Sequence, residues 1–220
     1  MHSLNYASVV TTAVHVISME RAALANLERI YKTNEWAQQN LARAVTEIIH
    51  SIKNGGKLVI CGVGKSGKIG QKVVATMISM GIHSAFLHPT EALHGDLGLI
   101  RLNDTLLFVS FSGRTMELLQ LLPHIPSTIP VIAITSHMDV SSCPILSSRP
   151  HDKAVLLPAP IHESEQTSFG VCAPTTSTTV ALSIGDALAI AIAKELYNSP
   201  GRCPIHVFKG YHPAGVLGTT

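Results

Sequence analysis

Three hydroxyl side chains lie within the short segment from Ser110 to Thr115 (SFSGRT), directly after an apolar run. Ser110, Ser112 and Thr115 can donate hydrogen bonds to phosphate oxygens, and Gly113 lets the backbone approach an anion closely. The positive end of a following helix attracts the same anion. Because a helix cap needs only one hydroxyl, this segment favours a phosphate-binding loop over simple capping.

A glycine-rich turn, Gly62–Gly67 (GVGKSG), also stands between an apolar run and a helical pattern. It is a weak dinucleotide signal, because no carboxylate stands at the end of the next apolar run. It is no nucleotide P-loop either, because that motif needs glycine where this chain has Val59. An anion-binding turn remains, with Gly64 and Ser66 at the phosphate and Lys65 adding positive charge. The alternative is a tight turn with a solvated lysine.

Glu117 follows the hydroxyl-rich segment by two residues. Its carboxylate could be a general base near the phosphate end of a substrate, or it could offset the dipole of a helix. The stretch His88–Asp96 adds two histidines and two acids, but its His-x5-His spacing matches no standard zinc helix. We therefore expect His94 to contact a ligand, His88 to be structural and no metal site to form.

Five consecutive hydroxyl residues, 175–179, open a long helical pattern after Pro174. A proline with hydroxyls around it is ordinary at a helix start. Five hydroxyls exceed what capping requires. We therefore expect Thr176 and Ser177 to form a second rim of the phosphate pocket.

The last stretch of the chain contains His212 within Tyr211–Gly215 (YHPAG). The apolar Val216 and Leu217 that follow predict that this tail packs against the body. The loop over residues 158–174 is long and polar, and long loops in compact domains are usually functional.

The strands and helices that must position these side chains are predicted to form an α/β domain. Their apolar runs are continuous rather than alternating, which is typical of parallel strands covered on both faces. The five runs are Lys57–Cys61, Ser84–Leu87, Thr105–Ser110, Val131–Thr135 and Lys153–Leu157. Helical patterns lie between them, so we predict a doubly wound parallel five-stranded sheet with helices on both faces.

The N-terminal segment is predicted to be helical over residues 3–52, with a break at Asn34. Asn54–Gly56 is a clear stop signal. We expect one domain over residues 1–220, made of N-terminal helices (1–54) and a sheet core with a C-terminal tail (55–220).

The composition excludes several classes of protein. The net charge is +2 with no run of basic residues, and aromatic residues are 5%, so we expect no nucleic-acid binding. No apolar stretch has the length of a membrane span and no signal peptide is recognisable, so we expect no membrane association. Four cysteines without CxxC spacing predict a reduced, cytoplasmic protein. Charged residues are only 14%, which predicts association with other subunits.

Taken together, these motifs resemble the sugar isomerase (SIS) domain family, and within it the D-arabinose 5-phosphate isomerase branch. The motifs that carry the resemblance are GVGKSGKIG (62–70), HPTEALHGDLG (88–98), SFSGRTME (110–117), APTTSTT (173–179), GDALA (185–189) and YHPAGVLG (211–218). The resemblance implies the SIS fold. It also implies an aldose–ketose isomerisation that interconverts D-ribulose 5-phosphate and D-arabinose 5-phosphate through an enediol, without a metal or organic cofactor.

The resemblance also assigns residues. It implies that Ser110, Ser112 and Thr115 hold the phosphate. It places Lys65, Glu117 and His212 in the active site with His94 nearby, and it implies a homotetramer in which a histidine can reach a neighbouring subunit. The proton-transferring base is left open among Glu117, Glu165 and His212.

Three features depart from the family pattern. The family has an acid just before APTTSTT, and an ungapped count puts Gln166 there, whereas a one-residue shift would put Glu165 there. Arg114 stands where that branch commonly has glutamate. The chain ends at Thr220, so we expect a form without CBS modules. The alternative function is a phosphosugar-binding sensor that keeps the hydroxyl loop but lacks catalysis.

Overall fold

The computed structural model describes residues 5–199 and 203–214. Two helices, α1 (Tyr6–Thr33) and α2 (Glu35–Lys53), form the N-terminal segment. Asn34 ends one helix and begins the next: its backbone N–H donates to the Ile30 carbonyl, and its side chain accepts from the Ala37 N–H. The predicted helical break at Asn34 is therefore confirmed.

The core of the molecule is one parallel sheet of five strands in the order β2-β1-β3-β4-β5. Every residue of β1, β3, β4 and β5 is buried, as the continuous apolar runs predict. The strands are β1 (Leu58–Cys61), β2 (Ser84–Leu87), β3 (Thr105–Val109), β4 (Val131–Thr135) and β5 (Ala154–Pro158).

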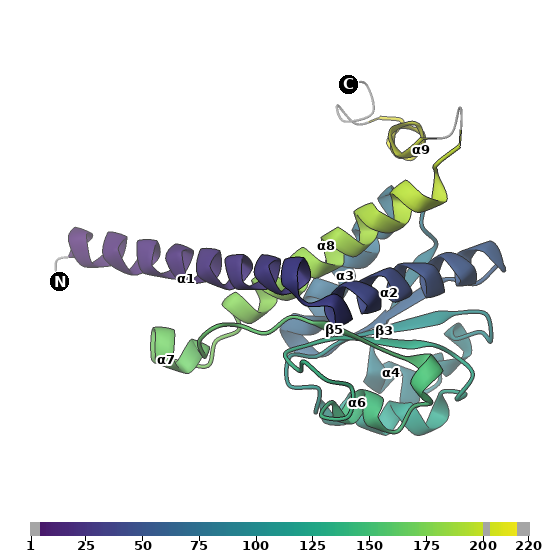
Figure 1. The fold of residues 1–220 in the computed structure, drawn as a ribbon, viewed down its shortest axis with the longest axis horizontal. Coiled ribbons are helices and arrows are strands. Elements are labelled where there is room, and N and C mark those ends of the chain that lie inside the picture. The colour runs from purple at the N-terminus through teal and green to yellow at the C-terminus, as the bar shows by residue number, and fades with distance from the viewer. Residues whose placement is uncertain (1–4, 200–202, 215–220) are drawn as a thin grey trace.

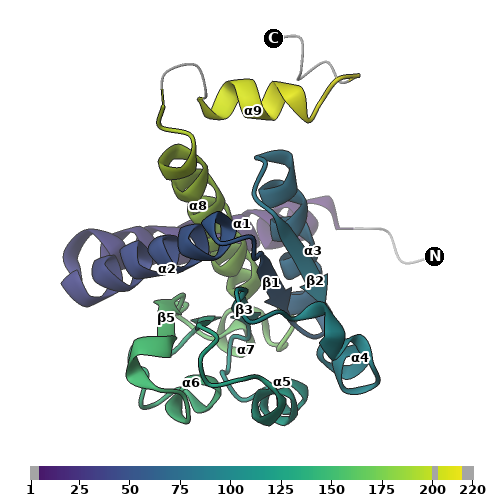
Figure 2. The ribbon, with the colours of Figure 1, turned by 90° about the vertical axis from the view of Figure 1, so that its right-hand side faces the viewer.

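Helices cover both faces of this sheet, so the doubly wound fold is confirmed (Figures 1 and 2). One face packs against α1, α2, α3 and α8, and the other against α4, α5 and α6. The remaining helices are α3 (Gly64–Ser79), α4 (Pro89–Leu93), α5 (Met116–Leu121), α6 (Pro144–Ser147), α7 (Glu165–Phe169), α8 (Thr176–Leu196) and α9 (Pro204–Gly210), with 3-10 turns at Asp96–Leu99, Leu122–His124 and His151–Lys153.

Helix α8 runs through the centre of the helical layer. Within residues 5–199 and 203–214, it is the one helix long and apolar enough to cross a membrane. Its apolar side chains instead pack against α1, α2 and α3, and its contact with α3 is close, because a Cβ on Gly185 would overlap the Val73 side chain. Burial in the core therefore accounts for its composition.

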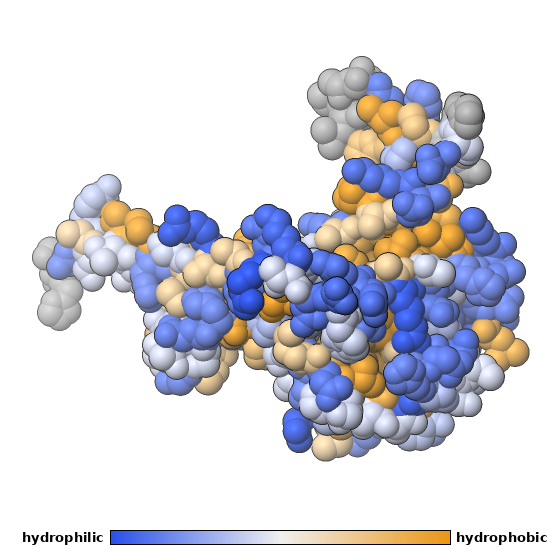
Figure 3. Space-filling model, in the orientation of Figure 1, coloured by the Kyte–Doolittle hydropathy of each residue, from blue (hydrophilic) through white to orange (hydrophobic). Residues whose placement is uncertain are grey.

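Two helices reach beyond the compact body. The N-terminal half of α1 projects away from the sheet, and Figure 3 shows apolar surface along it. At the other side of the molecule, α9 lies next to Gly81, whose carbonyl accepts a 2.7 Å hydrogen bond from the Tyr197 hydroxyl. Tyr211 also packs at Gly81, so the described part of the tail lies against the body. Val216 and Leu217 lie outside the described residues.

Candidate active site

The two segments that the sequence predicts to bind an anion follow two adjacent strands. Gly62–Gly67 follows β1, and Ser110–Thr115 follows β3. After β1 the chain enters α3 on one face of the sheet, and after β3 it enters α5 on the other face. Strands β1 and β3 therefore flank the point where the winding direction reverses, which is where open α/β sheets bind their ligands.

The segment Ser110–Thr115, here called the phosphate loop, brings its hydroxyls together. Ser110 is 2% exposed, and its Oγ lies 2.7 Å from the Thr115 Oγ1. Gly113 has φ +60°, and its N–H donates to the Ser110 carbonyl at 3.2 Å. The Ser112 Oγ accepts from the Arg114 N–H. Although Thr115 is the residue before α5, its side chain makes no capping bond, so capping does not explain this hydroxyl.

The phosphate loop is held by hydrogen bonds from the last residue of β4 and from the two residues that follow this strand. The Phe111 carbonyl accepts from the Thr135 Oγ1 at 3.0 Å, from the Ser136 N–H at 2.9 Å and from the Ser136 Oγ at 2.7 Å. The Ser112 carbonyl accepts from the His137 Nε2 at 2.9 Å. None of the sequence motifs predicted this support. Its only signal was the polar sequence that directly follows the apolar run of β4.

A carboxylate of the chain itself occupies the N-terminus of α8. The Glu165 Oε1 accepts from the Thr175 N–H at 2.6 Å, the Ser177 N–H at 3.0 Å and the Ser177 Oγ at 2.8 Å. The Thr176 hydroxyl lies at 3.4 Å from the same oxygen. Burial of the carboxyl opposes ionisation, but the hydrogen bonds from Thr175 and Ser177 outweigh it and hold the pKa of Glu165 below its ordinary value.

A cavity of about 140 Å³ lies between these groups, at the carboxyl ends of β3 and β4. Its polar wall is formed by Ser66, Thr135, Glu165, Ser177 and Thr178. Its apolar wall includes Phe111 of the phosphate loop. The cavity thus brings together Ser66, Ser177 and one residue of the phosphate loop, Phe111, whereas the three hydroxyl residues of that loop do not line it.

Lys65 and Glu117 begin the helices that follow the two central strands. Lys65 is exposed in the first turn of α3, after Gly64 at φ +58°, and Glu117 is half-buried in the first turn of α5. Neither side chain forms a hydrogen bond or ion pair with any residue that the structure describes. Both charged groups are thus available to a ligand.

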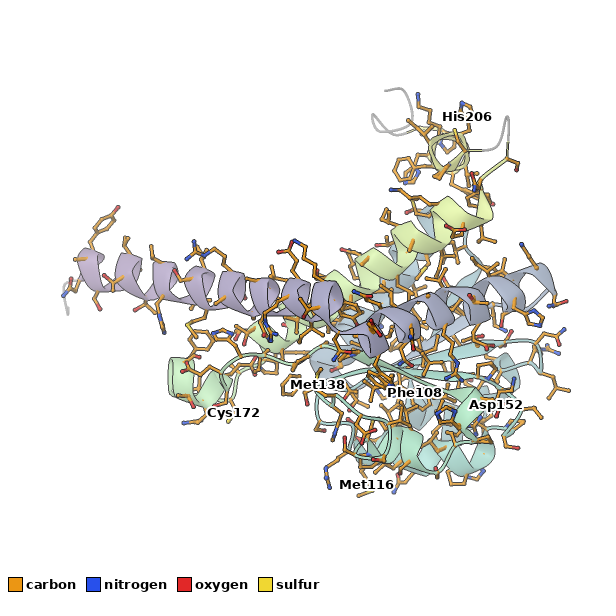
Figure 4. The ribbon with its side chains drawn as sticks, in the orientation of Figure 1. Phe108, Met116, Met138, Asp152, Cys172 and His206 are labelled. Carbon is orange, nitrogen blue, oxygen red and sulfur yellow. The ribbon has the colours of Figure 1, made fainter. Side chains whose placement is uncertain are left out.

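The histidines divide between two regions. His94 is exposed at the end of α4, and the Nδ1 of His88, at the carboxyl end of β2, is buried without a hydrogen-bond partner in the described chain. His212 lies beyond α9, where its Nδ1 bonds to the Phe208 carbonyl at 2.8 Å. Figure 4 shows that His206 of α9 and Met116 of α5 lie on opposite sides of the sheet. Within one chain, His212 is therefore not brought to the phosphate loop.

Gln166 points away from the Glu165 carboxylate network. Its Nε2 donates to the Gly170 carbonyl at 3.0 Å, and its Oε1 accepts from the Cys172 thiol, which Figure 4 shows beside α7. All four cysteines are free thiols, and the described residues contain no group of three His, Cys, Asp or Glu side chains able to hold a metal.

Comparison with known proteins gives a consistent family. The chain is 36% identical to arabinose 5-phosphate isomerase KpsF of Escherichia coli O6:H1 over 96% of its own length, and 35% identical to arabinose 5-phosphate isomerase KdsD of Francisella tularensis over 98%. It spans 58% and 60% of these two relatives. The solved structure of E. coli CFT073 c3406 in complex with arabinose 5-phosphate is 32% identical with a TM-score of 0.75, and the match covers 96% of this chain and all of that one.

The SIS domain model matches residues 51–191, from the end of α2 to the second half of α8. This range holds the whole sheet, the glycine-rich turn, the phosphate loop and the hydroxyl-rich start of α8. The chain belongs to the SIS domain family.

Proposed function

We propose that the chain is a phosphosugar isomerase that interconverts D-ribulose 5-phosphate and D-arabinose 5-phosphate. The observation that carries this proposal is the hydroxyl-lined phosphate loop at the switch point of a sheet that matches a solved structure described as a complex with arabinose 5-phosphate. The named isomerases at 35–36% identity support the same reaction.

The phosphate is held at the phosphate loop. The hydroxyls of Ser110, Ser112 and Thr115 donate hydrogen bonds to the phosphate oxygens. Gly113 lets the backbone come close to the phosphate. Gly64 and Ser66 approach the phosphate from the turn after β1, the strand that pairs with β3. Thr176 and Ser177 form the second rim of the phosphate pocket. There the ligand competes with the Glu165 carboxylate for their hydrogen-bond donors.

Glu117 is the proposed base. It removes the proton from the carbon next to the carbonyl of the sugar, and the electrons of that bond form the carbon–carbon double bond of an enediolate, whose oxygen takes a proton from water to give the enediol. The hydroxyl on the carbon that lost its proton then releases its own proton to water and becomes the new carbonyl, while Glu117 returns its proton to the former carbonyl carbon. Lys65 stabilises the negative charge that develops on the carbonyl oxygen. The free carboxylate of Glu117 supports its role, because Glu165 is already engaged by several donors and Gln166 cannot accept a proton at neutral pH.

His212 and His94 complete the site across a subunit interface. The exposed side chains of Tyr6, Val9 and Ile17 along α1 support association with further copies, and we propose a homotetramer. The position of His212, away from the phosphate loop of its own chain, supports a contribution to a neighbouring one. We propose one domain over residues 1–220 that acts in the cytoplasm, which its four free thiols support, without metal or organic cofactor.

The test is turnover of D-arabinose 5-phosphate to D-ribulose 5-phosphate by the purified protein, with and without a chelator. We expect turnover that survives chelation. Glu117→Gln is expected to lower kcat by about 100-fold or more while sugar-phosphate binding is kept. Ser112→Ala is expected to weaken binding, and unchanged affinity in that variant would contradict the assignment of the phosphate loop.

A phosphosugar sensor is the second candidate, favoured by Gln166 at the expected acid position and by the engaged carboxylate of Glu165. In that case the sugar phosphate raises the melting temperature but no product forms. Turnover by the wild type decides against the sensor.

A further inference from the structure

We propose that α7 is a latch on the phosphate pocket. In the free chain its Glu165 carboxylate takes the hydrogen-bond donors at the start of α8, and an incoming phosphate displaces the carboxylate and releases α7. The inference rests on the proposed function, because it describes how access to the proposed phosphate site is regulated. It starts from the place of Glu165, which lines the cavity and is also bonded to Ser177 on the second rim.

Several donors at the start of α8 converge on one oxygen of this carboxylate. The Glu165 Oε1 accepts from the N–H groups of Thr175 and Ser177 at 2.6 and 3.0 Å, and from the Ser177 Oγ at 2.8 Å. The hydroxyls of Thr175 and Thr176 each lie 3.4 Å from the same atom. Free N–H groups at a helix start, joined by hydroxyls, are the donors that proteins offer to phosphate oxygens. The carboxylate therefore uses the donors that a phosphate needs.

This contact differs from an ordinary helix cap. A capping side chain normally belongs to the residue before the helix or to the third residue of its first turn. Thr175 directly precedes α8, and its side chain makes no capping hydrogen bond. The acceptor comes instead from α7, ten residues earlier in the chain. The start of α8 is thus capped by a group on a separate helix, which can leave while α8 stays folded.

The donors need an acceptor in either state. Thr176 and Ser177 are only 2% and 7% exposed, and a buried polar group without a partner is costly. A phosphate and a carboxylate carry charges of the same sign, so they repel each other when they share one set of donors. Phosphate binding at this rim is therefore an exchange, in which the phosphate arrives as Glu165 leaves.

Helix α7 is attached to the body by few contacts. None of its residues is buried. Besides the Glu165 contact, it packs on α1: the Ser168 carbonyl oxygen lies 2.9 Å from the His15 Nε2, and the Phe169 ring meets the His15 ring edge-on. Figure 1 shows α7 outside the compact body, next to the projecting half of α1. Because so short a helix does not persist alone, loss of the Glu165 contact lets α7 open while the sheet stays folded.

The first test compares sulfate affinity by calorimetry at pH 7, because sulfate is a dianion like the phosphate group of the sugar. We expect Glu165→Gln to bind sulfate about tenfold more tightly than the wild type. The neutral amide keeps the shape of the side chain but is displaced more easily from the positive end of α8. Glu163→Gln, which removes one exposed charge from the same segment, is the matched control and should bind sulfate as the wild type does.

A second variant separates the latch from simple charge repulsion. Phe169→Ala keeps the Glu165 carboxylate but removes the ring that packs on α1. We expect it to bind sulfate about two- to threefold more tightly, because α7 is then held less firmly in the closed position. Val171→Ala is the control, since Val171 is an apolar residue of the same segment that is 55% exposed.

Hydrogen exchange of the wild type tests the latch without any substitution, in case a variant folds poorly. The amides of Ser168 and Gly170 donate to the Ser164 and Gln166 carbonyls within α7. Saturating sulfate should make this segment exchange about threefold faster or more, because the opened helix loses these bonds. The amide of Ser177 should stay protected, since sulfate replaces Glu165 as its acceptor.

The outcomes separate the latch from the proposed function. Tighter sulfate binding by Glu165→Gln and Phe169→Ala, but by neither control, supports the latch. Equal affinities in the wild type and Glu165→Gln overturn the latch and leave the phosphate site intact, as does unchanged or slower exchange of α7 in sulfate. If Phe169→Ala binds as the wild type while Glu165→Gln binds more tightly, the charge acts by repulsion alone and the latch is overturned. If neither the wild type nor Glu165→Gln binds sulfate, the phosphate site is refuted and both proposals fail.

Discussion

Replacing Glu165 by glutamine removes the negative charge that fastens α7 to the start of α8. In the wild type the carboxylate accepts from the Thr175 N–H, the Ser177 N–H and the Ser177 Oγ. Glutamine keeps one carbonyl oxygen of similar position, so its shape is preserved and the charge is lost. The variant therefore isolates the electrostatic part of the contact.

The magnitude follows from the exposure of the group. A carboxylate at a helix N-terminus contributes about 0.3–1 kcal/mol when exposed and up to about 2 kcal/mol when partly buried. Glu165 is half-buried, so solvent screening reduces its hydrogen bonds below their full strength. We expect Glu165→Gln to lower the free energy of unfolding by about 1.5 kcal/mol at pH 7. For a chain of this size, that corresponds to a fall in Tm of about 3–6 °C.

The pH dependence has a definite sign. The pKa of Glu165 is lower in the folded chain than its ordinary value of 4.5. The stabilisation is therefore fully present above the unfolded-state pKa and is lost as the pH falls through the folded-state pKa. The difference between the wild type and Glu165→Gln should be complete at pH 7 and should shrink below about pH 4.5.

The assay is urea unfolding of both proteins at several pH values, with Glu163→Gln as the matched control. Glu163 is an exposed residue of the same segment, and among the described residues its carboxylate accepts a hydrogen bond only from the Ser168 hydroxyl. If Glu165→Gln destabilises no more than Glu163→Gln at pH 7, the stabilising role of the Glu165 charge is refuted. If it instead abolishes turnover with an unchanged stability, Glu165 is the base and the proposed role of Glu117 is wrong.

Three further substitutions test the packing and the loop. Asp104→Asn breaks a buried ion pair with Lys57 at 2.7 Å and should lower the free energy of unfolding by about 3 kcal/mol in urea titrations. A loss of less than about 1 kcal/mol would contradict the expected stabilisation by this ion pair. Gly185→Ala places a methyl group against Val73 between α3 and α8 and should cost about 2 kcal/mol, measured in the same way. Gly113→Ala is strained at φ +60° and should weaken sulfate binding about tenfold or more in calorimetry, whereas unchanged affinity would show that the loop tolerates a side chain.

Much of the fold could be predicted because its signals are local. Continuous apolar runs of four to five residues match the buried strands β1, β3, β4 and β5. Asn34 stands between two helical patterns, and its side chain caps the second helix. Such signals depend on burial and on the backbone preferences of a few neighbouring residues.

The position of the phosphate loop was also predictable. In a parallel sheet the loops after adjacent strands meet at one edge, so Gly62–Gly67 and Ser110–Thr115 had to lie close together once β1 and β3 were neighbours. Residue types then indicated the chemistry, because hydroxyls and glycines next to a helix start suit an anion.

The sequence by itself therefore determined the layers of this protein and the edge at which an anion site is expected. Only the tertiary structure decided the partners of the charged and polar side chains. The hydroxyl of Ser177 is used by Glu165, twelve residues away, and the loop carbonyl of Ser112 is held by His137, twenty-five residues away. His212 bonds to Phe208 of α9, and Figure 4 shows His206 of this helix on the other side of the sheet from Met116, which directly follows the phosphate loop. The physical reason is that hydrogen-bond partners depend on the path of the whole chain, whereas strand and helix signals depend only on near neighbours.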